Sequence, residues 1–475
     1  MSTSLPRINA LAALVLIGFT VTGARAQVPV QGMPIPELAD VDSLMQTYMD
    51  DNNIRAGVLG FMNNGHIVYQ RAFGYKDEAL SVPLPESAMM RVASVTKPVT
   101  AAATRKLIDW GVIDLDQLVF HLDMDDGGIL DYEPWGGELG DERIADITVE
   151  HLLRHRGGWN RNAPGVPDLT RMEVVIATAM GFDPYRVPTR RETVEWIMAQ
   201  ELQFAPGTER HYSNVGYLIL GLIIEQESGT DWRTFVRTHV LDESMWFPTA
   251  DFEPGHTFSE DQNPREPWYN NNGLFGTNVF APNGADVPLP YGSWDHEARV
   301  AQGGMITTAV PLLNYLATYY VNEDVNNDID LIGKPLNGAL VNMAHDGRLR
   351  GTEALARQTG SGINYVIMLN TRIPVDPPAG GFMYVRELQA AIDSVLNAGT
   401  ITWPIREVDG IWFDFDYNGP EQGCYDQPYG SIGDLGQVPA YSKVRIKGSS
   451  TTWTGVIDRG HIALSAPEGS VVIGQ

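Results

Sequence analysis

Residues 91–100 read RVASVTKPVT, in which a serine precedes a lysine by three positions. Apolar residues then recur at helical spacing, so Ser94 to Trp110 is predicted to be a helix. Pro98 is compatible with this helix because it lies in the first turn, where backbone N–H groups have no intrahelical partner. The spacing therefore places the hydroxyl of Ser94 and the amine of Lys97 on one face of a helix N-terminus.

Ser94 and Lys97 have the chemistry of a nucleophile and its base. A serine hydroxyl is inert at its ordinary pKa, and a lysine can accept its proton when burial or a neighbouring cation lowers the lysine pKa. The positive end of the helix would also favour an oxyanion that forms beside Ser94. The structural alternative is a capping serine followed by a solvated lysine, and these residues alone do not decide between the two.

A second polar triplet, YSN at residues 212–214, precedes an apolar helix predicted over Asn214 to Ser228. A phenol beside an ammonium group has a lowered pKa, so Tyr212 could relay the serine's proton to a leaving group. Asn214 would offer an amide donor to a substrate carbonyl. Alternatively, Tyr212 packs at the helix start and Asn214 caps the helix.

A third triplet, HDG at residues 345–347, is predicted to end a strand before a turn at residues 348–351. Gly347 would let a substrate approach the backbone closely. A free N–H at this strand edge could complete an oxyanion hole opposite the N–H of Ser94. The alternative is an ordinary polar strand end.

Together the three triplets resemble the motifs of the serine β-lactamase and penicillin-binding-protein superfamily, with the closest likeness to class C β-lactamases, β-lactamase-like esterases and D-aminopeptidases. The similarity runs over most of residues 40–397 and includes ITVEHLLRHRGG at residues 147–158. The resemblance implies that Ser94 is the nucleophile and that Lys97 and Tyr212 are the proton-transfer pair. It implies that Asn214 binds the substrate and that His345 and Gly347 form a wall of the cleft. The N–H groups of Ser94 and Arg348 are implied to form the oxyanion hole. The resemblance implies no metal or other cofactor.

The resemblance also implies a mixed α/β (α+β) fold, in which an antiparallel five-stranded sheet is flanked by helices. Apolar runs agree with it, because they predict five strands: residues 56–62, 66–72, 340–344, 354–358 and 364–370. Helices predicted over residues 40–53 and 384–397 would cover one face of the sheet. The mainly helical residues between these two halves of the sheet would form an inserted all-helical lobe. Residues 251–296 are rich in Pro, Asn, Gly and aromatics and are predicted to be ordered loops with a functional role.

The chain divides into three predicted parts. Residues 1–26 are interpreted as a signal peptide, with an apolar run at residues 10–22 and an A-x-A cleavage site at residues 24–26. Residues 27–398 would form the hydrolase domain, and residues 403–475 a small β-rich appendage that resembles an opening coil of a parallel β-helix. Later apolar runs are too short to span a membrane. We therefore expect an exported protein, periplasmic or secreted, without an integral membrane segment after signal removal.

The composition is that of a globular protein with an acidic surface. Lys and Arg number 33 against 59 Asp and Glu, a formal charge of -26, so nucleic acid and anionic membranes would be repelled. The single cysteine, Cys424, excludes an intramolecular disulfide and zinc sites built from several cysteines. A small-molecule ester or amide is the expected partner, and the oligomeric state is left open.

Other candidate sites are weaker. Asp414 to Gly419 matches the first half of an EF-hand loop, but Tyr425 stands where a bidentate glutamate is needed, so an ordinary strand and turn is preferred. The acidic run at residues 324–328 lacks the loop glycine. His151 and His155 are interpreted as structural residues. The sequence has no G-x-S-x-G nucleophile elbow, which argues against an α/β-hydrolase.

One departure from the superfamily's pattern bears on the substrate. The third motif of its β-lactamases and carboxypeptidases is Lys-Thr-Gly or close to it and binds a substrate carboxylate, whereas His345 and Asp346 stand here. Asp346 would repel such a carboxylate, so neutral esters, or amides that bear an amine, are expected. The predicted function is an exported serine hydrolase that forms an acyl-enzyme on Ser94. The alternatives are a β-lactamase, a D-Ala carboxypeptidase or D-aminopeptidase on peptidoglycan-type substrates, and a catalytically silent binding module.

Overall fold

The computed structural model describes most of the chain between residues 28 and 404. The described ranges are 28–122, 127–241, 251–270, 272–322, 328–372 and 383–404, with three short strands at Ile411–Phe413, Lys443–Ile446 and Ala463–Ser465. The predicted signal peptide, the EF-hand-like stretch, Cys424 and most of the acidic run at 324–328 lie outside the described residues. Among the helices that are described, none is long and apolar enough to cross a membrane.

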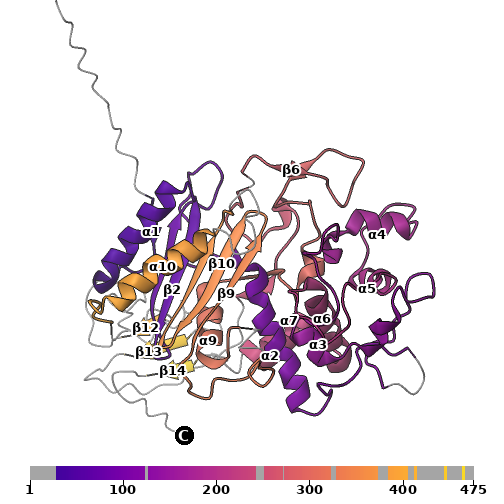
Figure 1. Ribbon diagram of the computed structural model, residues 1–475. Coiled ribbons are helices and arrows are strands. Elements are labelled where there is room, and N and C mark those ends of the chain that lie inside the picture. Colours follow the sequence, from indigo (N-terminus) through magenta and orange to yellow (C-terminus); the bar gives the residue numbers. More distant parts are fainter. Residues whose placement is uncertain are drawn as a thin grey trace, which may run out of the picture.

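A six-stranded antiparallel sheet forms the centre of the larger lobe (Figure 1). Its strand order is β1-β3-β2-β11-β10-β9, so the N-terminal hairpin and the three C-terminal strands join along β2 and β11. All five predicted strands are present, and the short edge strand β1 is the addition. The strands are β1 (Val30–Gln31), β2 (Ala56–Asn63), β3 (His66–Gly74), β9 (Asn342–Leu349), β10 (Thr352–Thr359) and β11 (Ile363–Leu369).

The edge strand β9 differs from its predicted bounds. It runs to Leu349, past the predicted end at Ala344, and Leu349 pairs with Thr352 of β10. The polar residues His345, Asp346 and Gly347 therefore lie within the strand and not at its end. Backbone pairing with β10 extends β9 through residues whose side chains do not alternate between apolar and polar. The apolar pattern of the sequence therefore predicted too early an end for this strand.

The β2–β3 hairpin is closed by the turn that its sequence predicts. Asn64 and Gly65 have φ values of 48° and 86°, the left-handed region that a two-residue Asn-Gly turn requires. Gly65 would meet no atom within 4 Å if it carried a Cβ, so its role is conformational and not one of packing.

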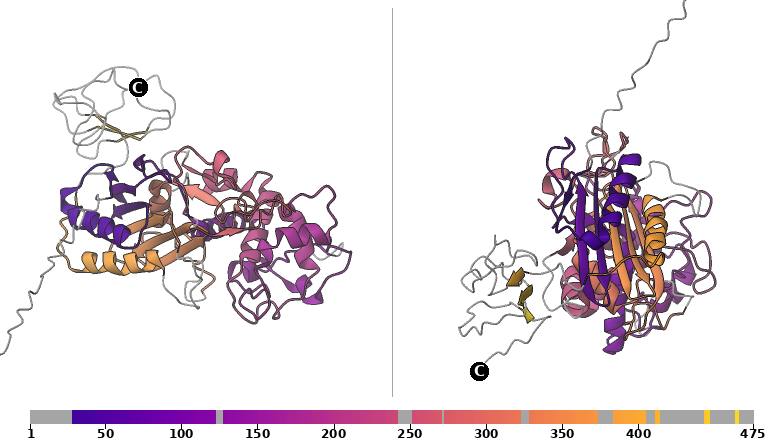
Figure 2. Two further views of the ribbon diagram at one scale, coloured as in Figure 1. Left: turned by 90° about the horizontal axis from the view of Figure 1, so that it is seen from above. Right: turned by 90° about the vertical axis from the view of Figure 1, so that its left-hand side faces the viewer.

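Two helices cover one face of the sheet, as predicted. They are α1 (Ala39–Asp51) and α10 (Tyr384–Asn397), which lie side by side in Figures 1 and 2. Their apolar faces pack on the strands in one hydrophobic core, with Met45, Leu388 and Ile392 fully buried. On the opposite face, α9 (Ala309–Thr318) contacts β2 and β11 in a second core that continues into the helical lobe. Burial of each such side chain contributes about 1.5–3 kcal/mol, so the two cores fix the sheet between the helices.

The helical lobe lies beside the sheet, on the right in Figure 1. Its longest helix, α6 (Asn214–Ser228), is buried from Val215 to Ile224 and packs against α2 (Thr96–Asp109). This burial explains why α6 is apolar on all sides. Among the described residues, the lobe also contains the helices α3 (Val149–Leu153), α4 (Glu173–Ala179), α5 (Arg190–Met198) and α7 (Trp232–Val236).

Residues 251–270 and 272–296 form loops with strands of only two or three residues and one 3₁₀ turn, as predicted, while their functional role stays a prediction. In a small sheet, β8 (Met305–Thr307) pairs with both β4 (Met90–Arg91) and β5 (Phe252–Pro254). The fully buried Arg91 donates to the carbonyls of His256 and Pro290 at 2.8 and 2.9 Å. Because a buried charge must be paired, Arg91 ties these loops to the segment that leads into Ser94.

The three described strands of the predicted appendage form one parallel sheet in the order β12 (Ile411–Phe413), β13 (Lys443–Ile446) and β14 (Ala463–Ser465). Strands β13 and β14 coincide with short β-type runs of the sequence at residues 443–447 and 461–465, and a third such run, at residues 470–473, lies outside the described residues. The division into a hydrolase domain and an appendage stays a prediction.

Candidate active site

Ser94 lies in a short 3₁₀ turn, η2 (Ala93–Val95), that leads directly into α2. The predicted helix therefore begins two residues later than expected, at Thr96. Ala93 has a φ of 50°, a left-handed conformation that is uncommon outside glycine and is found disproportionately at functional sites. Ser94 lines a cavity of about 760 Å³ that both lobes border.

The Ser94 hydroxyl is the meeting point of two further side chains. Lys97 donates from Nζ to Ser94 Oγ at 3.1 Å, and the Tyr212 hydroxyl donates to the same oxygen at 2.7 Å. Lys97 comes from α2 and Tyr212 from the residues just before α6, so the α2–α6 packing determines this geometry. Both residues that the sequence predicts as the proton-transfer pair are thus within hydrogen-bond reach of the predicted nucleophile.

Lys97 is completely buried. Its Nζ also donates to the backbone carbonyl of Gln302 at 2.6 Å and lies 4.8 Å from the centre of the Tyr212 ring. Gln302 is not among the residues that the sequence predicts for the site. These contacts hold the amine toward Ser94, and the solvated lysine of the structural alternative is excluded.

Tyr212 packs between an aromatic ring, that of His155, and a cationic group, the guanidinium of Arg161. The His155 ring lies 4.7 Å from the Tyr212 ring, and the guanidinium of Arg161 lies 4.7 Å from its centre on the cavity side. His155 is buried, and its Nδ1 accepts from the backbone N–H of Ser213 at 3.2 Å. His155 is therefore structural, as expected, but what it positions is the tyrosine of the site.

Asn214 is held by an acidic residue that the sequence analysis missed. Its Nδ2 donates to Asp168 Oδ2 at 2.5 Å, while Asp168 also accepts from the Thr170 hydroxyl and pairs with Arg161 at 3.5 Å. Burial opposes the charge of Asp168, but Arg161 and these hydrogen bonds hold its pKa below the usual range. The cap of α6 is Ser213, which accepts from the N–H of Gly216, so the interpretation of Asn214 as the cap is wrong.

Strand β9 forms the opposite wall of the site. An ideal Cβ on Gly347 would lie 2.2 Å from the carbonyl oxygen of Val92 and 2.9 Å from the backbone N of Ser94. Only a glycine therefore lets β9 approach the Ser94 turn this closely. His345, predicted with Gly347 for this wall, is 8% exposed and lines the cavity with Ser94. Arg348, whose N–H is predicted for the oxyanion hole, lines the same cavity.

Asp346 does not present an uncompensated charge to the cavity. Its carboxylate accepts from Nε of Arg386 at 2.8 Å and from Nη2 of the same guanidinium, which belongs to the first turn of α10. The expectation that Asp346 repels anionic substrates is therefore wrong, because it assumed a free carboxylate. Arg386 lies 40 residues along the chain from Asp346, and sequence spacing gave no sign of the pair.

Arginines dominate the wall of the cavity. Eight of them line it, against two aspartates, Asp168 and Asp346: Arg161, Arg171, Arg210, Arg299, Arg348, Arg350, Arg372 and Arg386. A chain with a formal charge of -26 gives no hint of such a wall, because the arginines come from segments far apart in the sequence. Among the described residues, no group of three or more His, Cys, Asp or Glu is placed to hold a metal ion.

The chain is similar to named proteins of one family. The family described as Beta-lactamase matches residues 41–379. Esterase EstB of Burkholderia gladioli is 26% identical over 258 residues, which cover 54% of this chain and 59% of that protein. The chain spans about half the length of the curated relatives it matches.

Two solved structures have the same fold at low sequence identity. The octameric penicillin-binding protein homologue from Pyrococcus abyssi gives a TM-score of 0.51 at 19% identity, covering 76% of this chain and 77% of that one. D-amino acid amidase from Ochrobactrum anthropi SV3 gives 0.50 at 18% identity, covering 76% and 98%. Since residues 41–379 make up most of the sequence, the chain belongs to the Beta-lactamase family.

Proposed function

We propose that this chain is an exported serine hydrolase that cleaves an ester or amide bond through an acyl-enzyme on Ser94. The observation that carries the proposal is the double hydrogen bond at Ser94 Oγ, with Lys97 at 3.1 Å and Tyr212 at 2.7 Å inside a cavity of substrate size. The family is one of serine hydrolases with the β-lactamase fold, which includes esterases, carboxypeptidases and amidases. That membership supports the same class of chemistry here.

In the acylation step, the proton of the Ser94 hydroxyl passes to Lys97 or Tyr212, whichever is deprotonated, while Oγ attacks the substrate carbonyl. The carbonyl electrons move onto oxygen, and the N–H groups of Ser94 and Arg348 would donate to this oxyanion. The tetrahedral intermediate collapses when Tyr212 delivers a proton to the leaving alcohol or amine. The leaving group departs, and an ester to Ser94 remains.

Deacylation would run through the same groups in reverse order. Water attacks the acyl-enzyme, its proton passes to the Tyr212 and Lys97 pair, and Ser94 Oγ recovers a proton as the carboxylic acid leaves. Asn214, held by Asp168, would donate its remaining amide proton to the substrate's carbonyl. His345 and Gly347 would bound the substrate on the side of β9.

A catalytically silent module with the same residues is the competing function, and covalent labelling separates the two. Folded protein treated with a fluorophosphonate should carry one label, and peptide mass spectrometry should place it on Ser94. The Ser94→Ala variant should take no label and should not hydrolyse nitrophenyl butyrate above background. A label on another residue, no label on folded protein, or equal turnover by the variant would contradict the proposal.

Asp168 offers a test of how Asn214 is positioned. Asp168→Asn should lower kcat/KM for nitrophenyl butyrate about tenfold, because a charge-assisted hydrogen bond to Asn214 is worth about 1.5–3 kcal/mol. Asp141→Asn is the matched control, since Asp141 also caps a 3₁₀ helix and pairs with an arginine, Arg143, but does not line the cavity. An equal loss of activity in the two variants would show a general effect on the fold and would contradict this role.

A further inference from the structure

The arginines that line the cavity differ in whether a carboxylate of the protein pairs with them. Four have carboxylate partners: Arg299 pairs with Glu173, Arg161 with Asp168, Arg386 with Asp346, and Arg348 with Glu353 at 3.8 Å. Arg171 and Arg350, by contrast, have no ion pair to any residue that the structure describes. The pairing of Arg348 is also incomplete, because its buried Nε and Nη2 atoms make no hydrogen bond. Positive charge is therefore left over on the wall of the cavity.

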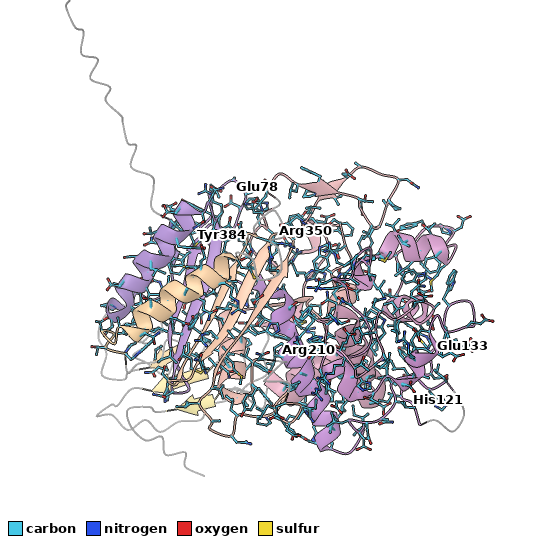
Figure 3. All side chains as sticks on the ribbon, in the orientation of Figure 1. Glu78, His121, Glu133, Arg210, Arg350 and Tyr384 are labelled. Atoms are coloured by element: carbon cyan, nitrogen blue, oxygen red, sulfur yellow. The ribbon has the colours of Figure 1, made fainter. Side chains whose placement is uncertain are left out.

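The excess charge is concentrated where the two lobes face each other. Arg171 ends the 3₁₀ turn η4 (Leu169–Arg171) of the helical lobe, whereas Arg350 lies in the β9–β10 turn, at the upper end of β9 in Figure 3. Arg348 belongs to β9, and Arg372 follows β11 and is 9% exposed. We call Arg171, Arg348, Arg350 and Arg372 the arginine cluster.

The members of the arginine cluster repel one another. Burial, followed by the charges of Arg348, Arg350 and Arg171, lowers the pKa of Arg372 to about 9. Burial and the charge of Arg348 lower the pKa of Arg350. Burial and Arg299, with a smaller contribution from Arg350, lower the pKa of Arg171, against the opposing effect of Asp168 and Glu173. Glu353 partly offsets the charge of Arg372, and Asp168 and Glu173 partly offset that of Arg171, so the repulsion within the arginine cluster is reduced but not cancelled.

We propose that the arginine cluster is a subsite for a polyanionic group of the substrate, a phosphate or a pair of carboxylates carried at a distance from the scissile bond. This deepens and rests on the proposed function, since the same cavity holds Ser94. Guanidinium groups bind such anions through two parallel N–H bonds, and several of them around one group select for more than one negative charge. A neutral ester brings no negative charge to Arg171 and Arg350, which have no ion pair among the described residues, whereas a polyanion relieves the repulsion within the cluster.

The global charge of the protein strengthens this assignment. With 59 acidic and 33 basic residues, this chain has carboxylates enough to pair Arg171 and Arg350 as well, as it pairs the buried Arg299 with Glu173. An acidic molecule also repels anions at long range, so a cationic cavity has to act at short range through direct contacts. The cavity volume of about 760 Å³ leaves room for both an acyl group at Ser94 and an anionic group at the cluster.

Direct binding tests the subsite without requiring any hydrolysis. Titration calorimetry of the Ser94→Ala protein should show that pyrophosphate and citrate bind at least about tenfold more tightly than acetate, because they present several charges to several guanidinium groups. Pyrophosphate tests the phosphate source of the anion, and citrate tests the carboxylate source. Binding should weaken as salt is added. Equal binding of all three anions, or no binding of either polyanion, would overturn the proposal.

Substitutions then locate the site. Arg171→Gln and Arg350→Gln should each weaken binding of the preferred polyanion about tenfold or more, and Arg350→Lys should recover part of the loss. Arg186→Gln is the matched control, because Arg186 is an exposed arginine paired with Glu192 and does not line the cavity. Unchanged binding in both cluster variants, with thermal unfolding like that of the parent, would overturn the assignment. Labelling of Ser94 is scored separately, so failure of the subsite and failure of the hydrolase proposal are distinguishable.

Discussion

Replacement of Lys97 by alanine, or of Tyr212 by phenylalanine, is expected to lower kcat for nitrophenyl butyrate by about 10²-fold or more, the usual contribution of a positioned acid or base. Both groups contact the same oxygen, Ser94 Oγ, so each variant leaves the hydroxyl with one proton-transfer neighbour in place of two. The double variant should be little slower than the slower single variant, because residues that act as one unit lose most of their effect with the first deletion.

The chain supplies a matched control for each of these substitutions. Lys106→Ala changes a second lysine on α2, and Tyr217→Phe removes a hydroxyl that donates to the carbonyl of Leu153 and not to Ser94. Both should retain kcat near that of the parent protein. Initial rates, with thermal unfolding to confirm the fold, provide the measurement. Near-normal kcat in Lys97→Ala or Tyr212→Phe at neutral pH would contradict the proton path.

The sequence predicted best what local patterns determine. Helices α6 and α10 have the predicted bounds, Asn214 to Ser228 and Tyr384 to Asn397, because each carries a long, unbroken helical pattern. That Ser94, Lys97 and Tyr212 lie together was predicted from the resemblance of their motifs to those of a known family, in which the equivalents of α2 and α6 are in contact. Spacing alone would not have brought residue 212 to residue 94, since that approach depends on packing between helices.

Features that depend on distant segments could not be predicted from the sequence. The sequence suggested that the Asp346 carboxylate has no ion-pair partner, but it pairs with Arg386, which lies on a helix that crosses the sheet. Asp168, which holds Asn214, sits in a short 3₁₀ cap that has no hydrophobic period. The arginine cluster combines residues from η4, β9, the β9–β10 turn and the end of β11, and the net acidity of the chain concealed it. Charge summed over a sequence says nothing about its distribution in space.

Gly347→Ala is expected to lower kcat by about 10²–10³-fold, the usual cost of losing an oxyanion-hole donor. The added Cβ would lie 2.2 Å from the carbonyl oxygen of Val92 and 2.9 Å from the N of Ser94, both backbone atoms that cannot rotate away. Strand β9 and the Ser94 turn would have to separate. The N–H groups of Ser94 and Arg348 would then no longer converge on one oxygen, which is where the proposed mechanism places the developing charge.

Gly303→Ala distinguishes this effect from a general loss of packing. A Cβ on Gly303 would face the same turn but at 3.4 Å from Ala93 and 3.6 Å from Ser94 N, which is ordinary van der Waals contact. It should therefore lower kcat far less than Gly347→Ala does. Overpacking at Gly347 also costs about 1–3 kcal/mol of stability, so rates must be measured well below the unfolding temperature of each variant. A folded Gly347→Ala protein with the kcat of the Gly303→Ala control would show that the approach of β9 to Ser94 does not form the oxyanion hole.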